Sequence, residues 1–413
     1  MIKKHPSFCI LPFISLSTIT DGRITVCCAN HADLRDSSSD SLEQIWNSTQ
    51  TKKMRLAFLK GERPKSCQDC WSTEDKGAMS FRHKSNFSYG RFEKRAMEMV
   101  NPETGEMPFE IKYLEVRISN LCNLACKMCF PNASTTVNAL WDQDVKKVLK
   151  KYHVKDIGKK QLDTFSDFSQ FLRDVRTIAP YMELIYLAGG EPFMEERFEE
   201  VFDALGEHKE HIQISFNSNL TKLKHGHFDI IPLLNQFKSV HLCLSIDGTP
   251  KVNEYVRTYS KTTDVEANYQ QLTQQLNHLS VSVPSAISAL NILDFPELME
   301  YCVSVFHPER ISHSFIHNPY LKVDVLPPEL VQEASKRIET FLSIKLNDLK
   351  ISPDIHLCIS ELCNSALVQL NKATQIPQSW DDFKYFINNL DKKCSTDILD
   401  VIPELTPYWT RDD

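Results

Sequence analysis

Residues 113 to 318 alternate short apolar runs with longer amphipathic stretches, and this alternation limits the folds open to the chain. Six runs have the length and composition of strands: Tyr113–Ser119, Glu183–Ala188, Gln213–Phe216, Val240–Ile246, Ser285–Leu290 and Arg310–Ile316. Other stretches have helical periodicity: Phe165–Tyr181, Glu195–His208, Ile230–Phe237, Val265–Leu276 and Phe295–Val305. Repeated βα units predict an α/β fold with a parallel sheet, either doubly wound or curved into a partial barrel. In both arrangements the residues that follow the strands meet on one face, where ligands bind.

The regions on either side differ from this core. Residues 1–95 are rich in Cys and Ser, and the stretches 41–48 and 55–60 predict two short helices there. From Pro328 an amphipathic run extends to Leu346, and the remaining residues read as mostly helical. Because 413 residues allow two or three domains, we predict a Cys-rich domain over 1–95, a core over 108–326 and a helical region over 327–413.

Charge and hydropathy exclude two classes of partner. The chain has 54 Asp and Glu against 47 Lys and Arg, a net charge of −7, opposite to the basic balance that nucleic acids attract. No apolar run approaches the roughly 18 residues needed to cross a bilayer. Lys3 and Lys4 precede the apolar stretch Phe8–Leu16, as in a secretory signal, but Pro12 interrupts it and no small-x-small cleavage site follows. We therefore expect a cytoplasmic protein with no nucleic-acid or membrane partner.

Eight of the 13 cysteines lie in the first 129 residues, and three of these follow the first predicted strand. Cys122, Cys126 and Cys129 form a C-x3-C-x2-C spacing in one short loop. Three thiolates that close on a four-iron cluster leave one iron open to a small molecule. Three core cysteines, or a zinc knuckle with a distant fourth ligand, are the alternatives. The odd cysteine count in an acidic chain favours metal or redox chemistry over a disulfide framework.

This loop resembles the cluster motif of the radical S-adenosylmethionine (SAM) superfamily, and the resemblance covers about half of the chain. It implies a partial (β/α)6 barrel in which Cys122, Cys126 and Cys129 hold a 4Fe–4S cluster. In that family the open iron binds SAM, and the reduced cluster cleaves it to methionine and a 5′-deoxyadenosyl radical. Many members have an aromatic residue just before the third cysteine. This chain has Met128 there, a thioether that can also pack against a ring.

Two later strand ends add to the resemblance. The second predicted strand leads into Gly189, Gly190, Glu191 and Pro192. This segment resembles one whose exposed backbone holds the SAM amino group, although glycines can serve only to turn the chain. The third predicted strand leads into Asn217 and Asn219, at the place where the family contacts the ribose. An Asn-rich turn is the alternative there.

The fourth and fifth predicted strands lead into further polar residues. Ser245 lies at the end of the fourth strand, Asp247 and Arg257 follow it, and Asn291 follows the fifth. By the resemblance, the serine meets the ribose or the methionyl part of SAM, and the arginine pairs with its carboxylate through two parallel hydrogen bonds. A surface ion pair is the alternative for Arg257. Asn291 is a candidate for a polar contact with SAM.

Two other features each have two interpretations. His313, Phe315 and His317 alternate on one face of the sixth predicted strand, where they either line a substrate cavity or pack as structural residues. Residues 142–160 hold seven lysines, which either bind an anionic ligand or form a solvated helix.

A second cysteine set precedes the core and consists of Cys9, Cys27, Cys67 and Cys70. Four thiolates suffice for a tetrahedral zinc site or a fully ligated cluster. The spacing from Cys9 through Gly22 to Cys27 resembles the SPASM and twitch auxiliary-cluster modules of the superfamily, which here come before the core. The resemblance implies a second 4Fe–4S cluster that relays electrons, with a structural zinc ribbon as the alternative. Cys28 can replace Cys27 in the set, and His31 is either a ligand or a bystander.

Together these features predict a radical SAM enzyme, an oxidoreductase or modifying enzyme that abstracts hydrogen from its substrate. The resemblance implies a peptide or protein side chain as substrate, with a nucleotide or a sugar-like alcohol as alternatives, and a reductase or flavodoxin-like protein as electron donor. A non-catalytic iron–sulfur or peptide-binding scaffold is the competing class, and the intact cysteine triplet and Arg257 argue against it. A zinc hydrolase is disfavoured because no His-rich site with an adjacent carboxylate has a familiar spacing.

Overall fold

The computed structural model describes residues 5–37, 39–152, 161–373 and 377–409. Its main strands are β1 (Ser15–Thr18), β2 (Ile24–Thr25), β3 (Tyr113–Arg117), β4 (Leu184–Ala188), β5 (Gln213–Ser218), β8 (Ser239–Leu244), β9 (Leu279–Ile287) and β10 (Arg310–Phe315). They form one eight-stranded sheet in the order β10-β9-β8-β5-β4-β3-β1-β2. The pairs β1–β3, β3–β4, β4–β5 and β9–β10 are parallel, and β1–β2 is antiparallel. This mostly parallel sheet confirms the predicted fold class, a partial barrel with helical parts.

Contacts between Cα atoms divide the chain into two compact units. The first unit comprises residues 1–120, 161–216 and 232–240, and the second comprises residues 121–160, 217–231 and 241–413. This division cuts the chain differently from the predicted domains 1–95, 108–326 and 327–413, whose boundaries stay a prediction.

In the first unit, the N-terminal segment adds a strand to the edge of the core sheet. Strand β1 runs parallel to β3, with Ser15 opposite Tyr113 and Ser17 opposite Glu115. Ser17 Oγ also donates to the Glu115 carboxylate at 2.7 Å. Strand β1 is not one of the six predicted strands, because its partner lies about 100 residues away and no local pattern announces a parallel pairing.

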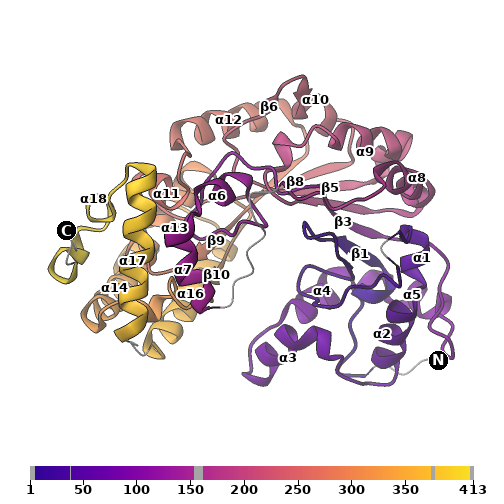
Figure 1. The fold of residues 1–413 in the computed structure, drawn as a ribbon, viewed down its shortest axis with the longest axis horizontal. Helices are drawn as coiled ribbons and strands as arrows, with labels where there is room; N and C mark the ends of the chain where they lie inside the picture. The colour runs from indigo at the N-terminus through magenta and orange to yellow at the C-terminus, as the bar shows by residue number, and fades with distance from the viewer. Residues whose placement is uncertain (1–4, 38, 153–160, 374–376, 410–413) are drawn as a thin grey trace. The chain divides into compact units, whose positions relative to one another are not determined.

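Short helices make up much of the rest of the N-terminal region: α1 (Leu42–Trp46), α2 (Thr49–Leu59), α3 (Gln68–Asp75), α4 (Phe81–Tyr89) and α5 (Glu93–Met99). Ser41 begins α1 with a capping box, since its side chain accepts from Gln44 N and the Gln44 side chain accepts from Ser41 N. The helices predicted over 41–48 and 55–60 are confirmed. Figure 1 shows α8 (Phe168–Ile178) and α9 (Phe198–Leu205) packed side by side in the same unit.

The second unit contains β9 and β10, which pair in parallel register from Arg310 opposite Ser282 to Phe315 opposite Ile287. Strand β9 begins at Leu279, earlier than the predicted start at Ser285. The predicted start is wrong because Ser280 and Ser282, which favour turns by composition, alternate here along a regular strand.

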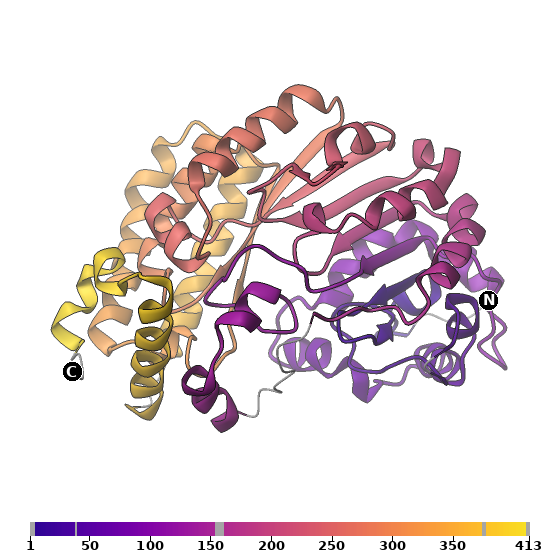
Figure 2. The same ribbon diagram turned by 45° about the horizontal axis from the view of Figure 1, so that its top comes forward.

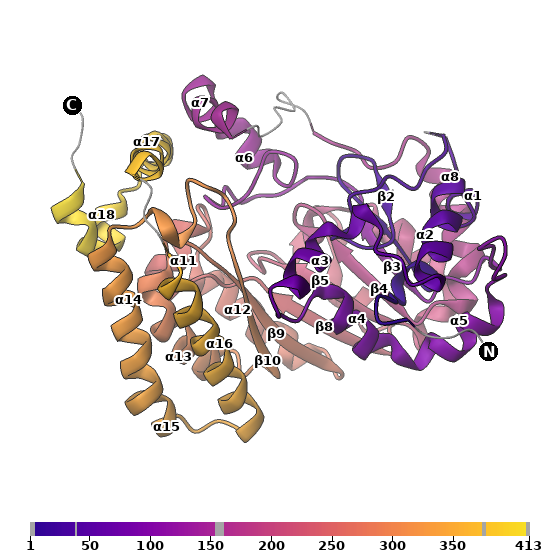
Figure 3. The ribbon, with the colours of Figure 1, turned by 90° about the horizontal axis from the view of Figure 1, so that it is seen from below.

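The helices of the second unit are α6 (Thr135–Leu140), α7 (Gln143–Lys151), α10 (Ile230–Leu234), α11 (Pro250–Val256), α12 (Thr262–Gln275), α13 (Phe295–Val305), α14 (Pro328–Thr340), α15 (Leu346–Asp348), α16 (Pro353–Asn371), α17 (Pro377–Cys394) and α18 (Ile398–Val401). Helix α14 begins at the predicted Pro328. Figure 2 shows the yellow α17 beside the purple α7, and Figure 3 shows α14 beside α16.

The predicted lysine-rich stretch is helical where the structure describes it. Helix α7 pairs Lys147 with Asp144 and Lys151 with Asp382 of α17, as expected for a solvated helix, and residues 153–160 lie outside the described residues. In the described part of the chain, no helix has both the length and the apolar character that a membrane crossing requires.

Candidate functional site

The predicted cluster loop lies in the second unit and is held by two backbone hydrogen bonds. Ala125 N donates to Thr258 O at 3.0 Å, and Lys127 N donates to Val256 O at 2.8 Å. Cys126 lies between these two anchors. The segment that follows the fourth predicted strand therefore fixes the loop on both sides of its middle cysteine.

The other two cysteines of the loop are fixed by local contacts. Thr136 Oγ1 donates to Cys122 O at 2.6 Å, and Cys129 N donates to Cys126 O at 3.0 Å. Burial, together with the smaller effect of the neighbouring Cys126, raises the pKa of the Cys129 thiol to about 12. Such thiols keep their protons at neutral pH until a metal displaces them.

Arg257 lies beside this loop in a buried ion pair. Its side chain is 15% exposed, and its Nη2 lies 2.7 Å from Asp247 Oδ2, whose side chain is 1% exposed. Its Nη1 donates to Cys126 Sγ at 3.9 Å. The alternative of a surface ion pair is therefore wrong. The structure instead brings three predicted site residues, Arg257, Asp247 and Cys126, into contact.

Two buried donors beside this ion pair have no hydrogen-bond partner among the described residues: Arg257 Nε and Asn253 Nδ2. Asn253 Oδ1 accepts from Asp247 N at 2.9 Å, so this amide, which was not predicted as a site residue, is built into the same network. Unmade buried hydrogen bonds are costly and point to a missing acceptor. A ligand that carries a carboxylate and ribose oxygens, as SAM does, fits these donors.

Asn219 connects the segment after β5 to the cluster loop. Its Nδ2 donates to Asn123 Oδ1 at 3.1 Å, and Asn123 Nδ2 donates to Thr221 Oγ1 at 2.8 Å. Asn123 and Thr221 were not predicted as site residues, because polar loop residues carry no distinctive spacing. Asn217 is exposed and Ser245 is half-buried, and their contact with SAM stays a prediction.

Asn291 is almost completely buried and its amide is fully used. Its Nδ2 donates to Asp247 O at 2.7 Å and to Ala286 O at 2.8 Å, while its Oδ1 accepts from Ser288 N at 2.8 Å. The side chain thus joins the ends of β8 and β9 and holds the backbone of Asp247. A direct contact between Asn291 and SAM stays a prediction.

The glycine segment after β4 lies in the first unit. Gly189 has φ of +126°, and a Cβ there would lie 2.8 Å from Ser119 O, so the position requires glycine. Gly190 N donates to the same Ser119 O at 3.1 Å. The Glu191 carboxylate accepts from the N–H of Phe193 at 3.2 Å, one residue after Pro192. The turn therefore has a fixed shape, and its contact with the SAM amino group stays a prediction.

The predicted auxiliary site forms one cavity in the first unit, lined by Cys9, Cys27, Cys67 and Cys70. Burial raises the pKa of the Cys9 thiol to about 12, and Cys67 and Cys70 add to this rise. No three Cys, His, Asp or Glu side chains in the described ranges are grouped as they would be around a metal ion. The chemistry of four thiols around one buried cavity nevertheless fits a thiolate-bound metal centre.

Two residues that were not predicted lie at this cavity. Asn30 Nδ2 donates to Cys67 Sγ at 3.3 Å, and Arg82 lines the cavity while its guanidinium pairs with Glu74 at 2.7 Å. An amide donor and a cation beside thiolates both favour the charged form of the sulfur.

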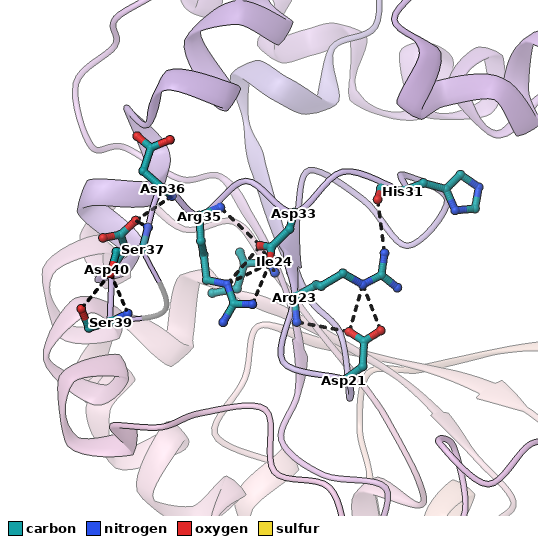
Figure 4. Close-up of polar contacts among 10 residues, drawn as sticks. All are labelled: Asp21, Arg23, Ile24, His31, Asp33, Arg35, Asp36, Ser37, Ser39 and Asp40. Atoms are coloured by element: carbon teal, nitrogen blue, oxygen red, sulfur yellow. Dashed lines mark hydrogen bonds and ion pairs between the residues drawn. The ribbon is translucent and has the colours of Figure 1, made fainter. Parts of the chain in front are cut away.

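Cys28 and His31 do not line the cavity. Cys28 is exposed and interacts with Arg117, so the structure favours Cys27 as the fourth thiol. Figure 4 shows Arg23 paired with Asp21 and bonded to the His31 carbonyl, while the His31 ring points away from them. That ring is exposed, and its Nε2 lies 2.9 Å from Asp69 Oδ2, which favours the bystander interpretation.

His313 packs as a structural residue. Its ring meets Phe295 of α13 edge to face, with centroids 5.8 Å apart, and meets Phe315 in the same way at 5.0 Å. These two ring contacts favour the structural interpretation of His313, and a substrate cavity along this face stays a prediction.

Two family models match this chain. The model described as the radical SAM superfamily matches residues 116–267, and the model described as an iron–sulfur cluster-binding domain, SPASM, matches residues 9–71. The first range contains the cysteine triplet and Arg257, and the second runs from Cys9 past Cys70. No curated protein matches the chain in sequence.

Several solved structures are similar to this one. SuiB of Streptococcus suis bound to precursor peptide SuiA is 12% identical with a TM-score of 0.38, over 65% of this chain and 53% of that one. SuiB bound to SAM is 12% identical with a TM-score of 0.36, over 74% and 62%. The radical SAM methyltransferase TsrM of Kitasatospora setae, with cobalamin and a 4Fe–4S cluster, is 13% identical with a TM-score of 0.32, over 52% and 39%. The chain thus spans less than two thirds of each of these structures.

Proposed function

Because this chain belongs to the radical SAM superfamily and carries a SPASM domain, we propose that it is an enzyme that cleaves SAM reductively and abstracts a hydrogen atom from its substrate. The observation that carries the proposal is the buried Arg257 beside Cys126, with two unmatched donors next to it. A non-catalytic scaffold has no need to keep buried donors unsatisfied for a ligand that carries a carboxylate.

The chain's own residues position the reactants. The thiols of Cys122, Cys126 and Cys129 are the proposed ligands of a 4Fe–4S cluster, which when bound supplies the electron that breaks SAM. Arg257 pairs with the SAM carboxylate and is oriented by Asp247, whose own charge it balances at 2.7 Å. Since the Arg257 side chain is buried, its attraction to a bound carboxylate is stronger than it would be in water.

The other predicted contacts complete the SAM site by resemblance. The segment Gly189–Pro192 offers backbone to the SAM amino group. Asn217 and Asn219 face the ribose, Ser245 meets the ribose or the methionyl part of SAM, and Asn291 holds the backbone of Asp247 at 2.7 Å. These roles extend the proposal and are tested together with it.

The four thiols of the SPASM domain are the proposed ligands of a second 4Fe–4S cluster that relays electrons. A cluster with four protein ligands has no open iron for substrate, so four thiols at one cavity favour electron transfer. A zinc ion in the same site would be purely structural.

For the substrate we propose a peptide or protein side chain, the class that the resemblance to SPASM proteins implies. A sugar-like alcohol or a nucleotide is the second class. The electron that starts the reaction comes from a reductase or a flavodoxin-like protein in this proposal.

The proposal is tested by incubating anaerobically reconstituted protein with dithionite and SAM, with one substrate class at a time. We expect 5′-deoxyadenosine from the wild type and none from Cys126→Ala. Cys358→Ala, which changes a cysteine of α16 outside both cysteine sets, is the matched control and should retain the product. Absence of 5′-deoxyadenosine from the wild type with every substrate class would favour the scaffold instead.

A further inference from the structure

A buried lysine lies inside the cluster loop. Lys127 stands between Cys126 and Cys129, and its side chain is 1% exposed. Lysines are almost never buried to this extent unless the charge is paired. The neighbours of its Nζ are Asp391 Oδ1 at 3.4 Å, Thr258 Oγ1 at 3.1 Å, Thr396 Oγ1 at 3.4 Å and the centre of the Tyr255 ring at 4.1 Å.

The carboxylate that faces this lysine is itself held from several sides. Asp391 lies in the last turn of α17, and its side chain is 10% exposed. It accepts from Thr396 Oγ1 at 2.6 Å, from Ile398 N at 2.9 Å and from Tyr255 Oη at 3.1 Å. With three donors besides the ammonium, the position of the anion is fixed before the lysine meets it.

The pair connects parts of the chain that no local pattern relates. The backbone of Lys127 is bonded to Val256, the last residue of α11, at 2.8 Å, whereas its side chain reaches α17 near the C-terminus. Asp391 lies outside both residue ranges that the family models match, 9–71 and 116–267.

Stability alone does not account for charged groups at this place. Well-packed apolar residues of similar volume are often as stable as a buried ion pair or more so, since two charges must be desolvated. What an apolar pair would not supply is a positive charge on the loop whose thiols take negative charge when they bind iron. Lys127 is one residue from Cys126 and two from Cys129 in that loop, so its charge belongs to the segment that carries the thiols.

We propose that Asp391 is a positioning residue of the cluster site: it holds the Lys127 ammonium in place, and so fixes the cluster loop between α11 and α17 with one positive charge in the segment that carries the thiolates. The inference rests on the proposed function, in which these thiolates hold the cluster. It makes α17 part of the site without any contact between that helix and SAM.

The test uses the full chain, reconstituted anaerobically. In Asp391→Asn the side chain keeps its shape and loses its charge. The cluster to follow is the SAM-responsive one, whose electron paramagnetic resonance signal changes when SAM is added. We expect this cluster to release iron to a chelator at least ten times faster in Asp391→Asn than in the wild type. Asp382→Asn is the matched control, because Asp382 of α17 also forms an ion pair, in this case with Lys151 of α7. It should behave like the wild type.

A double variant, Lys127→Met with Asp391→Leu, separates positioning from stability. We expect its thermal midpoint to match the wild type, because apolar groups replace the pair. The reduction potential of its SAM-responsive cluster should become more negative, because of the two opposite charges removed the positive one belongs to the cluster loop and the negative one to α17. A wild-type potential in this double variant, or wild-type iron release in Asp391→Asn, would overturn the proposal. A wild type with no SAM-responsive cluster would overturn the proposed function, and this inference with it.

Discussion

Two adjacent cysteines of the SPASM domain lead to opposite predictions. Cys27 is 9% exposed and lines the cavity of the auxiliary site, whereas Cys28 is exposed and interacts with Arg117. Cys27→Ser should therefore remove one cluster ligand, and Cys28→Ser should remove none. Since two four-iron clusters bring about eight irons per chain, Cys27→Ser should hold about four and Cys28→Ser about eight.

The same prediction can be expressed as a difference in the free energy of unfolding between Cys27→Ser and the wild type. Replacing the buried Cys27 sulfur by oxygen costs about 1 kcal/mol in lost apolar burial and polar desolvation. A structural metal centre contributes on the order of 10 kcal/mol to the fold that encloses it. Metal-free Cys27→Ser should thus unfold within about 1 kcal/mol of the metal-free wild type, while the reconstituted proteins should differ by several times that amount.

The assay is iron and zinc content after anaerobic reconstitution, followed by urea unfolding with and without metal. Four irons in Cys28→Ser together with eight in Cys27→Ser would refute the assignment of the fourth thiol. The nature of the metal is read from a third variant, in which Cys122, Cys126 and Cys129 are all Ala. About four irons in that variant would support the auxiliary cluster. About one zinc without iron would instead identify the site as a structural zinc site.

Three other predictions follow from single residues. Gly189→Ala adds a Cβ 2.8 Å from Ser119 O at φ of +126°. It should cost about 2 kcal/mol or more in urea unfolding and weaken SAM binding at least tenfold by calorimetry, whereas Gly90→Ala, with nothing within 4 Å, should do neither. Burial raises the pKa of Asp294 from 3.8 to about 6, so its contribution to stability is full below pH 3.8 and is lost as pH rises to about 6. In metal-free protein this loss should amount to at most about 3 kcal/mol and should be absent from Asp294→Asn. Arg55 is completely buried and donates to three oxygens at 2.8 to 3.1 Å, so Arg55→Met should cost about 3 kcal/mol or more in urea unfolding.

Each of these predictions has a result that would contradict it. A Gly189→Ala protein with wild-type SAM affinity would exclude the glycine turn from the SAM site. An unchanged slope of stability against pH in Asp294→Asn would assign the pH dependence to other groups. A loss below about 1 kcal/mol in Arg55→Met would mean that the three oxygens find other donors.

The sequence was most informative where chemistry and local pattern coincide. Strands β3, β4 and β10 could be predicted because buried parallel strands are short apolar runs, and Pro328 marks the start of α14 because proline fits the first turn of a helix. The cysteine spacings carried the two candidate metal sites, since ligands of one metal recur at short fixed intervals.

Contacts between distant loops could not be predicted in the same way. Lys127 and Asp391 are ordinary charged residues in the sequence, and only the fold brings them to 3.4 Å. The amides of Asn123 and Asn219, which meet at 3.1 Å, are typical turn residues by composition. For such pairs the information lies in the tertiary arrangement, because neither residue has a neighbour in sequence that hints at its partner.

Alternation along a strand separates two faces without saying which of them a helix covers. His313 lies opposite Ser285 in the pairing of β10 with β9, whereas Ser282 lies opposite Arg310, on the other face. His241 of β8 shares this second face with Ser282, because its Nε2 lies 3.0 Å from Ser282 Oγ.

Parallel strands are usually apolar on both faces because helices cover both. Here His241, Ser280 and Ser282 are half-buried and bonded to one another at 2.7 and 3.0 Å, so this face of the second unit has polar side chains in place of an apolar layer. The polar residues at alternate positions of β9 therefore distinguish the two faces of the sheet better than a lone histidine such as His313, whose ring meets Phe295 on the opposite face.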